Sequence, residues 1–230
     1  DMEDVIKAVE NGTLAESRID DAIERILKLI LWQKDITRNK DMVYDFEALL
    51  KCSLDTVIEG MVLLKNESVL PLSKGTKAVI LGKSAKEPLE CGSGSTYITT
   101  PLHTSLYEEC DKVGIIASGE ENKDSEVVIY AARAEGGENS DRTSMALDNE
   151  DEEHISSVLK TAKEKGKKTI VVLNIAAPVD MQTWVEYADA ILCEFVPGCM
   201  GQKATAAVLA GEANPGGRLP VTFPVKLTDS

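Results

Sequence analysis

Apolar side chains in the first part of the chain recur at the spacing of α-helices. Over residues 19–31 they repeat at intervals of three and four positions, which predicts one helix with a single apolar stripe. A second helical pattern covers about residues 45–64, and the polar, charged stretch 35–44 between them is expected to be a connector. Because an apolar stripe must pack against another surface, we expect both helices to belong to a larger structure.

From residue 76 onward the pattern changes to short apolar runs rich in Val and Ile. Such runs, without polar alternation, are typical of strands buried on both faces and hence of a mostly parallel sheet. Helical patterns at about 101–112, 150–165 and 200–210 separate them. The sequence therefore predicts a three-layer α/β sandwich with a mostly parallel sheet of about five or six strands, preceded by two helices. The expected strands lie at 77–82, 126–132, 168–174, 190–196 and 219–223.

Composition narrows the classes of partner. The 230 residues carry a net charge of −14, which argues against a nucleic acid or an anionic membrane, since either would need a basic patch. No apolar run reaches the roughly 18 residues of a membrane span. We therefore expect neither a nucleic-acid nor a membrane partner. Nothing in the composition indicates an oligomeric state.

Five cysteines are spread along the chain, an odd number without a C-x-x-C pair. This pattern suits a reducing compartment and provides no structural zinc site, so we expect a cytoplasmic protein without metal or cofactor. The chain opens with Asp1 and enters a helical pattern directly. We therefore expect it to be a segment of a longer protein.

The loop 134–142 is the most suggestive stretch for function, because it follows the expected strand 126–132. It holds three carboxylates, an arginine and two glycines, which permit close approach to another surface. In open α/β folds, ligands bind at loops that leave the carboxyl ends of strands. Polar loops at 174–180 and 197–199 are expected along the same edge. A solvated acidic loop is the alternative reading of 134–142.

Other candidates carry weaker signals. The stretch Cys91 to Ser95 could cradle a phosphate, as in a flavodoxin-like nucleotide binder, but it lacks the last glycine of G-x-G-x-x-G and any following Lys-Ser/Thr. The only histidines, His103 and His154, have no metal-ligating neighbours at suitable spacing, and His154 is expected at the surface. No G-x-S-x-G elbow is present to hold a serine nucleophile.

Five motifs along the chain, taken in order, resemble glycoside hydrolase family 3. They are Gly12 to Leu27 (G-x-L-x-x-x-R-I-D-x-A-x-x-R-I-L), Glu59 to Leu72 (E-G-M-V-L-L-K-N-x-x-x-L-P-L), Gly92 to Ser95 (G-S-G-S), Val171 to Met181 (V-V-L-N-x-x-x-P-V-D-M) and Asn214 to Pro224 (N-P-x-G-R-L-P-V-T-F-P). Members of this family pair a (β/α)8-like barrel with a C-terminal α/β sandwich. The resemblance implies barrel helices over residues 1–34, a linker and helix over 35–68, and the sandwich domain over 69–230.

The resemblance also implies site residues. In members that hydrolyse β-glucosides, a loop of the sandwich domain supplies the general acid/base, and that role falls on Glu138. Asp141 and Arg142 would then support the loop through a charge pair, and Tyr97 and Ser95 would contact substrate. A retaining mechanism needs a second carboxylate as nucleophile, and the family places it on the barrel, outside this chain. The acid would hold its proton through burial under substrate and nearness to that carboxylate.

Two departures from the family pattern stand out. Asn139 and Ser140 replace the usual glycine and tyrosine after the acid/base, and only the short stretch 119–125 joins two strands where most members have a helix. The implied parent enzyme is a retaining β-glucosidase first and a β-xylosidase second, acting on β-linked oligosaccharides or aryl and alkyl β-glucosides together with its own N-terminal barrel. The isolated segment is expected to be inactive. A non-catalytic interaction domain of the same fold is the competing class.

Overall fold

A computed structural model describes residues 1–34, 36, 43–100, 102–120, 123–138 and 141–229. The chain divides into two units, Asp1–Asp45 and Phe46–Ser230. The sequence-based boundaries at 34/35 and 68/69 stay predictions. All five cysteines are free thiols, and no described helix is long and apolar enough to cross a bilayer.

The first unit holds two helices, α1 (Met2–Glu10) and α2 (Glu16–Lys34). Helix α2 contains the predicted stretch 19–31. Its apolar stripe lies at the surface, where Ile26, Leu27 and Leu31 are each half exposed or more. Within the described part of the first unit, therefore, no other element covers this stripe.

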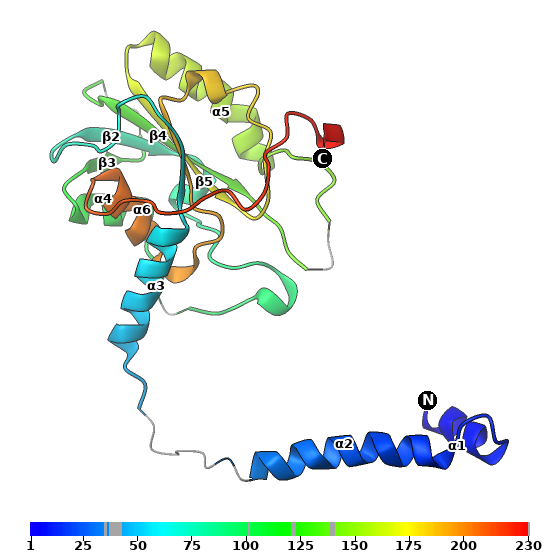
Figure 1. Cartoon of the computed structure of the whole chain (residues 1–230). Coiled ribbons are helices and arrows are strands. Elements are labelled where there is room, and N and C mark those ends of the chain that lie inside the picture. Colours follow the sequence, from blue (N-terminus) through cyan, green and yellow to red (C-terminus); the bar gives the residue numbers. More distant parts are fainter. Residues whose placement is uncertain (35, 37–42, 101, 121–122, 139–140, 230) are drawn as a thin grey trace. The chain divides into compact units, whose positions relative to one another are not determined.

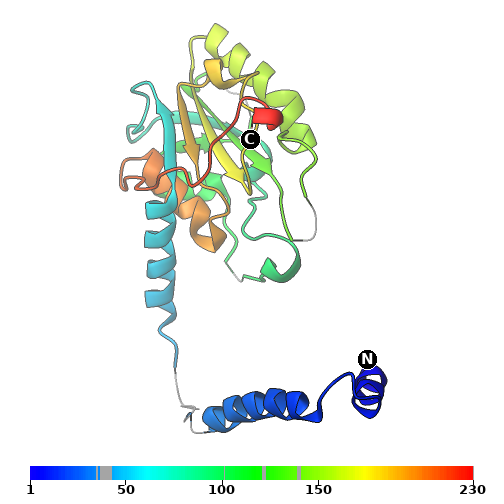
Figure 2. The same cartoon turned by 45° about the vertical axis from the view of Figure 1, so that its right-hand side comes forward.

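The second unit is a sheet of six strands with helices on both faces (Figures 1 and 2). The strand order is β1-β6-β5-β4-β2-β3, with β1 antiparallel and the remaining neighbours parallel. Helix α5 covers one face, and α4 and α6 cover the other. This confirms the predicted three-layer sandwich. The elements are α3 (Phe46–Gly60), β1 (Val62–Asn66), β2 (Lys77–Leu81), α4 (Leu106–Lys112), β3 (Ile116–Ser118), β4 (Val127–Ala134), α5 (Asn149–Glu164), β5 (Lys168–Ile175), β6 (Ala190–Cys193) and α6 (Gly201–Leu209).

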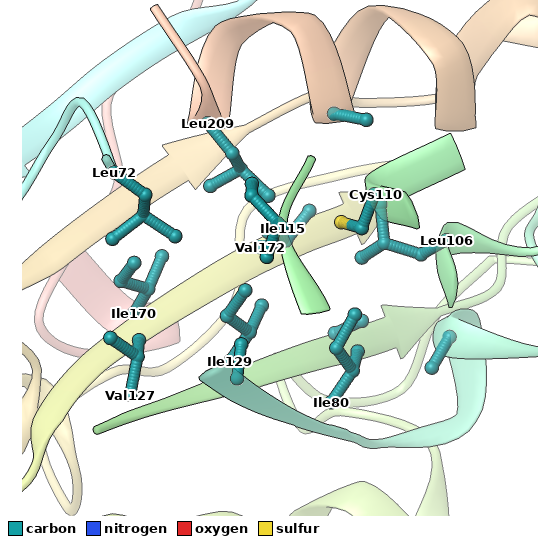
Figure 3. Close-up of a cluster of buried hydrophobic side chains, with 14 of the residues drawn as sticks. Leu72, Ile80, Leu106, Cys110, Ile115, Val127, Ile129, Ile170, Val172 and Leu209 are labelled. Carbon is teal, nitrogen blue, oxygen red and sulfur yellow. The ribbon is translucent and has the colours of Figure 1, made fainter. Parts of the chain in front are cut away.

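Alternate residues of the central strands enter opposite cores. On the face of α4 and α6, Ile80, Ile129 and Val172 pack with side chains from both helices (Figure 3). On the other face, residues one position along, such as Tyr130 and Val171, pack against α5. Because both faces are buried, the strands need apolar residues at nearly every position. This explains the unbroken Val and Ile runs.

Two sequence predictions about element boundaries were wrong. The helical pattern 45–64 ends at Gly60, and the chain then forms β1, where Val62 pairs with Cys193. Pairing with β6 thus overrides the helical periodicity over the last three residues of that pattern. The predicted strand 219–223 is not a strand. Its Phe223 packs against the α5-side core, and the Val225 carbonyl just beyond it accepts a hydrogen bond from the Gln182 side-chain amide.

The parallel strands bring their carboxyl ends to one edge of the sheet. Strand β4 ends level with β5, where Ala134 pairs with Ile175, and β2 ends beside Tyr130 of β4. The segments that follow β2, β4, β5 and β6 therefore leave the sheet at the same edge. Between β3 and β4, the described residues 119–120 and 123–126 contain no helix.

Candidate functional site

The loop after β4 lies against the segment that follows β2. Ser93 and Gly137 form a parallel β-bridge, which joins the two loops backbone to backbone. A Cβ atom on Gly137 would overlap Ser93, and one on Gly136 would come within 2.7 Å of the side chain of Ala176. The two glycines therefore serve the close approach that the sequence predicted.

Glu138 follows directly after this bridge and turns its carboxylate toward the opposite loop. Its Oε2 atom accepts hydrogen bonds from the Ser95 backbone N–H at 3.0 Å and from the Ser95 hydroxyl. Both residues are exposed. The Ser95 hydroxyl and then the Ser95 N–H stabilise the ionised form, so the pKa of Glu138 lies below its ordinary value.

Arg142 supports the loop in a different way from the one predicted. Its guanidinium donates to the carbonyl oxygen of Pro178 at 3.1 Å and to those of Ala177 and Ala146. Asp141 is exposed, and the ion pairs seen among the described residues do not include one between it and Arg142, so the structure gives no support to the predicted charge pair. Burial lowers the pKa of Arg142 and outweighs the opposing effect of the nearby Asp148 carboxylate. The fork of guanidinium donors suits several converging carbonyls better than one carboxylate.

A cavity of about 530 Å³ opens between the two loops. Its wall includes Tyr97, whose side chain is 68% exposed, and His103, which contacts the carboxylate of Glu90 at 3.0 Å. Asp141 and Arg142 also line this cavity, whereas Ser95 and Glu138 do not. In the described part of the chain, no three His, Cys, Asp or Glu side chains gather as a metal site would require.

Arg133, near the end of β4, lines the cavity and lies among several acceptors. It pairs with Glu135 through Nη2 and approaches Asp148 through Nε at 3.3 Å. Nη1 also donates to the carbonyl oxygen of Glu87 at 2.9 Å. Glu135 is exposed, and the ion pair with Arg133 holds its side chain.

Sequence analysis did not single out Asn174, the residue that connects three of the segments at this edge. It is fully buried in β5, accepts a hydrogen bond from the Ser84 hydroxyl at 2.9 Å, and donates to the Phe195 carbonyl at 2.8 Å. A polar amide directly after four apolar residues of a buried strand was the signal that could have identified it, because buried polar groups are nearly always hydrogen-bonded.

The segment 91–95 and His154, the candidates for nucleotide and metal binding, lie in surroundings that do not suit those ligands. Residues 94–96 form a 3₁₀ turn, and the Ser95 N–H that a phosphate would need is already donated to Glu138. His154 is exposed, as predicted, with its Nδ1 atom 2.7 Å from the Glu150 carbonyl oxygen. Neither arrangement indicates a nucleotide or metal site.

Comparisons with known proteins agree on one family. The family model described as "Glycosyl hydrolase family 3 C-terminal domain" matches residues 61–230. Thermostable beta-glucosidase B of Acetivibrio thermocellus is 32% identical over 97% of this chain and 32% of that protein. Probable beta-D-xylosidase 6 of Arabidopsis thaliana is 28% identical over 96% of this chain and 32% of that protein. The chain thus spans about a third of the length of these curated relatives.

Solved structures show the same architecture. Beta-glucosidase 3B from Thermotoga neapolitana, solved in complex with glucose, superposes with a TM-score of 0.85 at 26% identity. The match covers 99% of this chain and 38% of that one. The Bifidobacterium adolescentis GH3 beta-glucosidase gives a TM-score of 0.83 at 23% identity, over 99% of this chain and 36% of that one, which supports the fold alone.

Proposed function

Because this chain belongs to the glycosyl hydrolase family 3 C-terminal domains, we propose that it supplies the general acid/base, Glu138, of a retaining β-glycosidase. One observation carries the assignment of the residue. Glu138 is an exposed carboxylate at the strand-end edge of the sheet, directly after the bridge between Gly137 and Ser93. A group in that place can reach a substrate brought to this edge by another domain.

The chemistry divides between two domains. In a retaining glycosidase, one carboxylic acid protonates the leaving oxygen while a carboxylate roughly 5–5.5 Å away attacks the sugar. The first group then acts as a base on the water that releases the sugar. This chain contributes the first group and, by our proposal, the barrel contributes the nucleophile. The chain on its own is therefore proposed to be inactive.

Glu138 needs a change of surroundings before it can act as an acid. In this chain the two donors of Ser95 lower the pKa of Glu138. A bound sugar and a barrel wall would bury the carboxylate, and the nucleophile would add a like charge, both of which raise a carboxyl pKa. We therefore propose that assembly of the complete site raises the pKa of Glu138 toward neutral pH.

The proposed substrates are β-glucosides, with β-xylosides second. The relatives support this order, since beta-glucosidase B is 32% identical to this chain over the aligned residues and the probable xylosidase is 28% identical. The exposed ring of Tyr97 on the cavity wall is a surface on which an aglycone sugar could stack. Asp141 and Arg142, which line the same cavity, are proposed to shape it.

The test uses the protein with its barrel restored. We expect Glu138→Gln to slow hydrolysis of alkyl β-glucosides by about 100-fold or more, because general acid catalysis contributes about 10²–10⁴-fold. For nitrophenyl β-glucoside, the rate of the first step should fall less, since nitrophenolate leaves without protonation. Azide should restore turnover of the small variant Glu138→Ala by attacking the glycosyl-enzyme without base assistance. Glu135→Gln, on the same loop, is the matched control and should retain activity.

Other outcomes identify the competing classes. Equal rates for wild type and Glu138→Gln would favour a non-catalytic interaction domain of the same fold. A nucleotide that raised the melting temperature of the chain would support the nucleotide-binding class. Hydrolysis by the isolated chain, lost in Glu138→Ala, would disprove the proposed division of the site between two domains.

A further inference from the structure

We propose that Ser95 is a positioning residue that acts as a latch on Glu138, holding the carboxylate on the segment 92–96 until substrate displaces it. The inference rests on the proposed function for its consequence, but its geometry stands independently. Two donors of one residue converge on a single atom, Oε2 of Glu138: the Ser95 N–H at 3.0 Å and the Ser95 hydroxyl. One residue thereby fixes the direction of an otherwise exposed side chain.

The latch is built on a braced turn. The Thr96 hydroxyl donates to the Ser93 carbonyl at 2.8 Å, and the Tyr97 N–H donates to the Gly94 carbonyl at 3.2 Å. These bonds close the turn that presents Ser95. The bridge from Ser93 to Gly137 then holds this turn beside the loop of Glu138. Both partners of the latch are therefore anchored by backbone contacts that do not depend on the latch itself.

The chemical consequence differs between the two steps of a retaining mechanism. Hydrogen bonds to a carboxylate favour its ionised form, which is the form that a general base needs. The same bonds oppose the protonated form that must donate to the leaving oxygen. Ser95 therefore favours the second step, in which Glu138 acts as a base, over the first, in which it acts as an acid. A substrate group that accepts a hydrogen bond from the Ser95 hydroxyl or N–H would release Glu138 for the first step. The latch links acid strength to occupancy of the site.

The first experiment needs no enzymatic activity. We would titrate this chain and follow the ¹³C shift of the Glu138 side-chain carboxyl by NMR. Ser95→Ala removes the hydroxyl, so the pKa of Glu138 should rise, whereas Ser95→Thr keeps the hydroxyl and should leave it low. Ser156→Ala is the matched control, because Ser156 is a partly exposed serine on α5 whose hydroxyl donates to the Thr183 carbonyl, away from Glu138. An unchanged titration in Ser95→Ala would overturn the latch.

The second experiment uses the protein with its barrel restored. Ser95→Ala should move the basic limb of the kcat/KM profile to higher pH, and Ser95→Thr should return it toward wild type. A purely structural role of Ser95 would lower activity without moving the limb, and that result would overturn the latch as a regulator of catalysis. If the NMR shift occurs while Glu138→Gln leaves hydrolysis unchanged, the latch stands and the proposed function fails.

Discussion

Asn174 and Leu89 are joined by a reciprocal pair of hydrogen bonds. The Asn174 amide donates to the Leu89 carbonyl at 3.2 Å, and the Leu89 N–H donates back to Asn174 Oδ1 at 2.5 Å. Leu89 lies 85 positions earlier in the chain, in the segment that follows β2, and it lines the cavity. The side-chain amide of Asn174 thereby bonds to both backbone groups of Leu89, as a neighbouring strand would. This holds in place the stretch of chain that leads to the segment 92–96.

Removal of this amide should destabilise the fold. Asn174→Ala leaves the Leu89 N–H, the Leu89 carbonyl and the Ser84 hydroxyl without the partner that Asn174 provides, and each buried unsatisfied group costs about 1–3 kcal/mol. We expect the free energy of unfolding to fall by about 3 kcal/mol or more, measured by urea denaturation. Asn149→Ala, at the exposed start of α5, is the control and should change it by less than about 0.5 kcal/mol. Equal effects would contradict this role for Asn174.

Asp151 should stabilise the carboxyl ends of β2 and β4. Its buried carboxylate accepts from the backbone N–H groups of Arg133 at 2.7 Å and Lys83 at 3.1 Å, next to the ends of β4 and β2. Asp151→Ala should lower the unfolding free energy by about 2–3 kcal/mol, and Asp151→Asn by less, since it keeps one acceptor oxygen. Glu153→Ala, exposed on the same helix, is the matched control for thermal or urea unfolding. If the alanine variant were as stable as the control, this stabilising role would be wrong.

Glu194 should make stability depend on pH. Its side chain is buried, Oε2 accepts a hydrogen bond from the Thr205 hydroxyl, and Oε1 has no partner among the described atoms. Burial raises its pKa from 4.5 to about 7, against the opposing effect of Thr205. The folded state therefore favours the protonated form, whose contribution is complete below pH 4.5 and is lost as pH rises through about 7.

The variant Glu194→Gln should remove this dependence. One pKa unit corresponds to about 1.4 kcal/mol, so the wild type should lose roughly 3 kcal/mol between pH 4.5 and 8 from this group alone. Denaturation curves at pH 5 and pH 8 should therefore differ less for Glu194→Gln than for wild type. Glu212→Gln, on the exposed turn after α6, should behave like wild type. A pH dependence that survives in Glu194→Gln would assign the effect to other groups.

Gly137→Ala should separate the two loops with little cost to the fold. The new methyl group would overlap Ser93, and both residues are exposed, so the loops should move apart while the core stays intact. We expect the unfolding free energy to change by about 0.5 kcal/mol or less, and the pKa of Glu138 to rise as Ser95 withdraws. NMR titration and thermal unfolding check the two parts. Gly60→Ala, which has open space around its Cβ position, is the control.

Local pattern was enough to predict the sheet strands β2, β4, β5 and β6, because each is a run buried on both faces. It misplaced β1, since the residues after Gly60 continue a helical period and only their pairing with β6 makes them a strand. It also assigned a strand to 219–223, whose apolar residues include Phe223, packed in the α5-side core. Periodicity reports which residues are buried, but not which partner buries them.

The sequence by itself determined the α/β class, the family resemblance and the choice of Glu138, because motif order and carboxylate position are written along the chain. Only the tertiary structure decided which groups surround that residue. Ser95 lies 43 positions before Glu138, and the carbonyls bound by Arg142 lie up to 36 positions away from it. No local pattern encodes such contacts, since they arise when separate parallel strands bring their loops to one edge of the sheet.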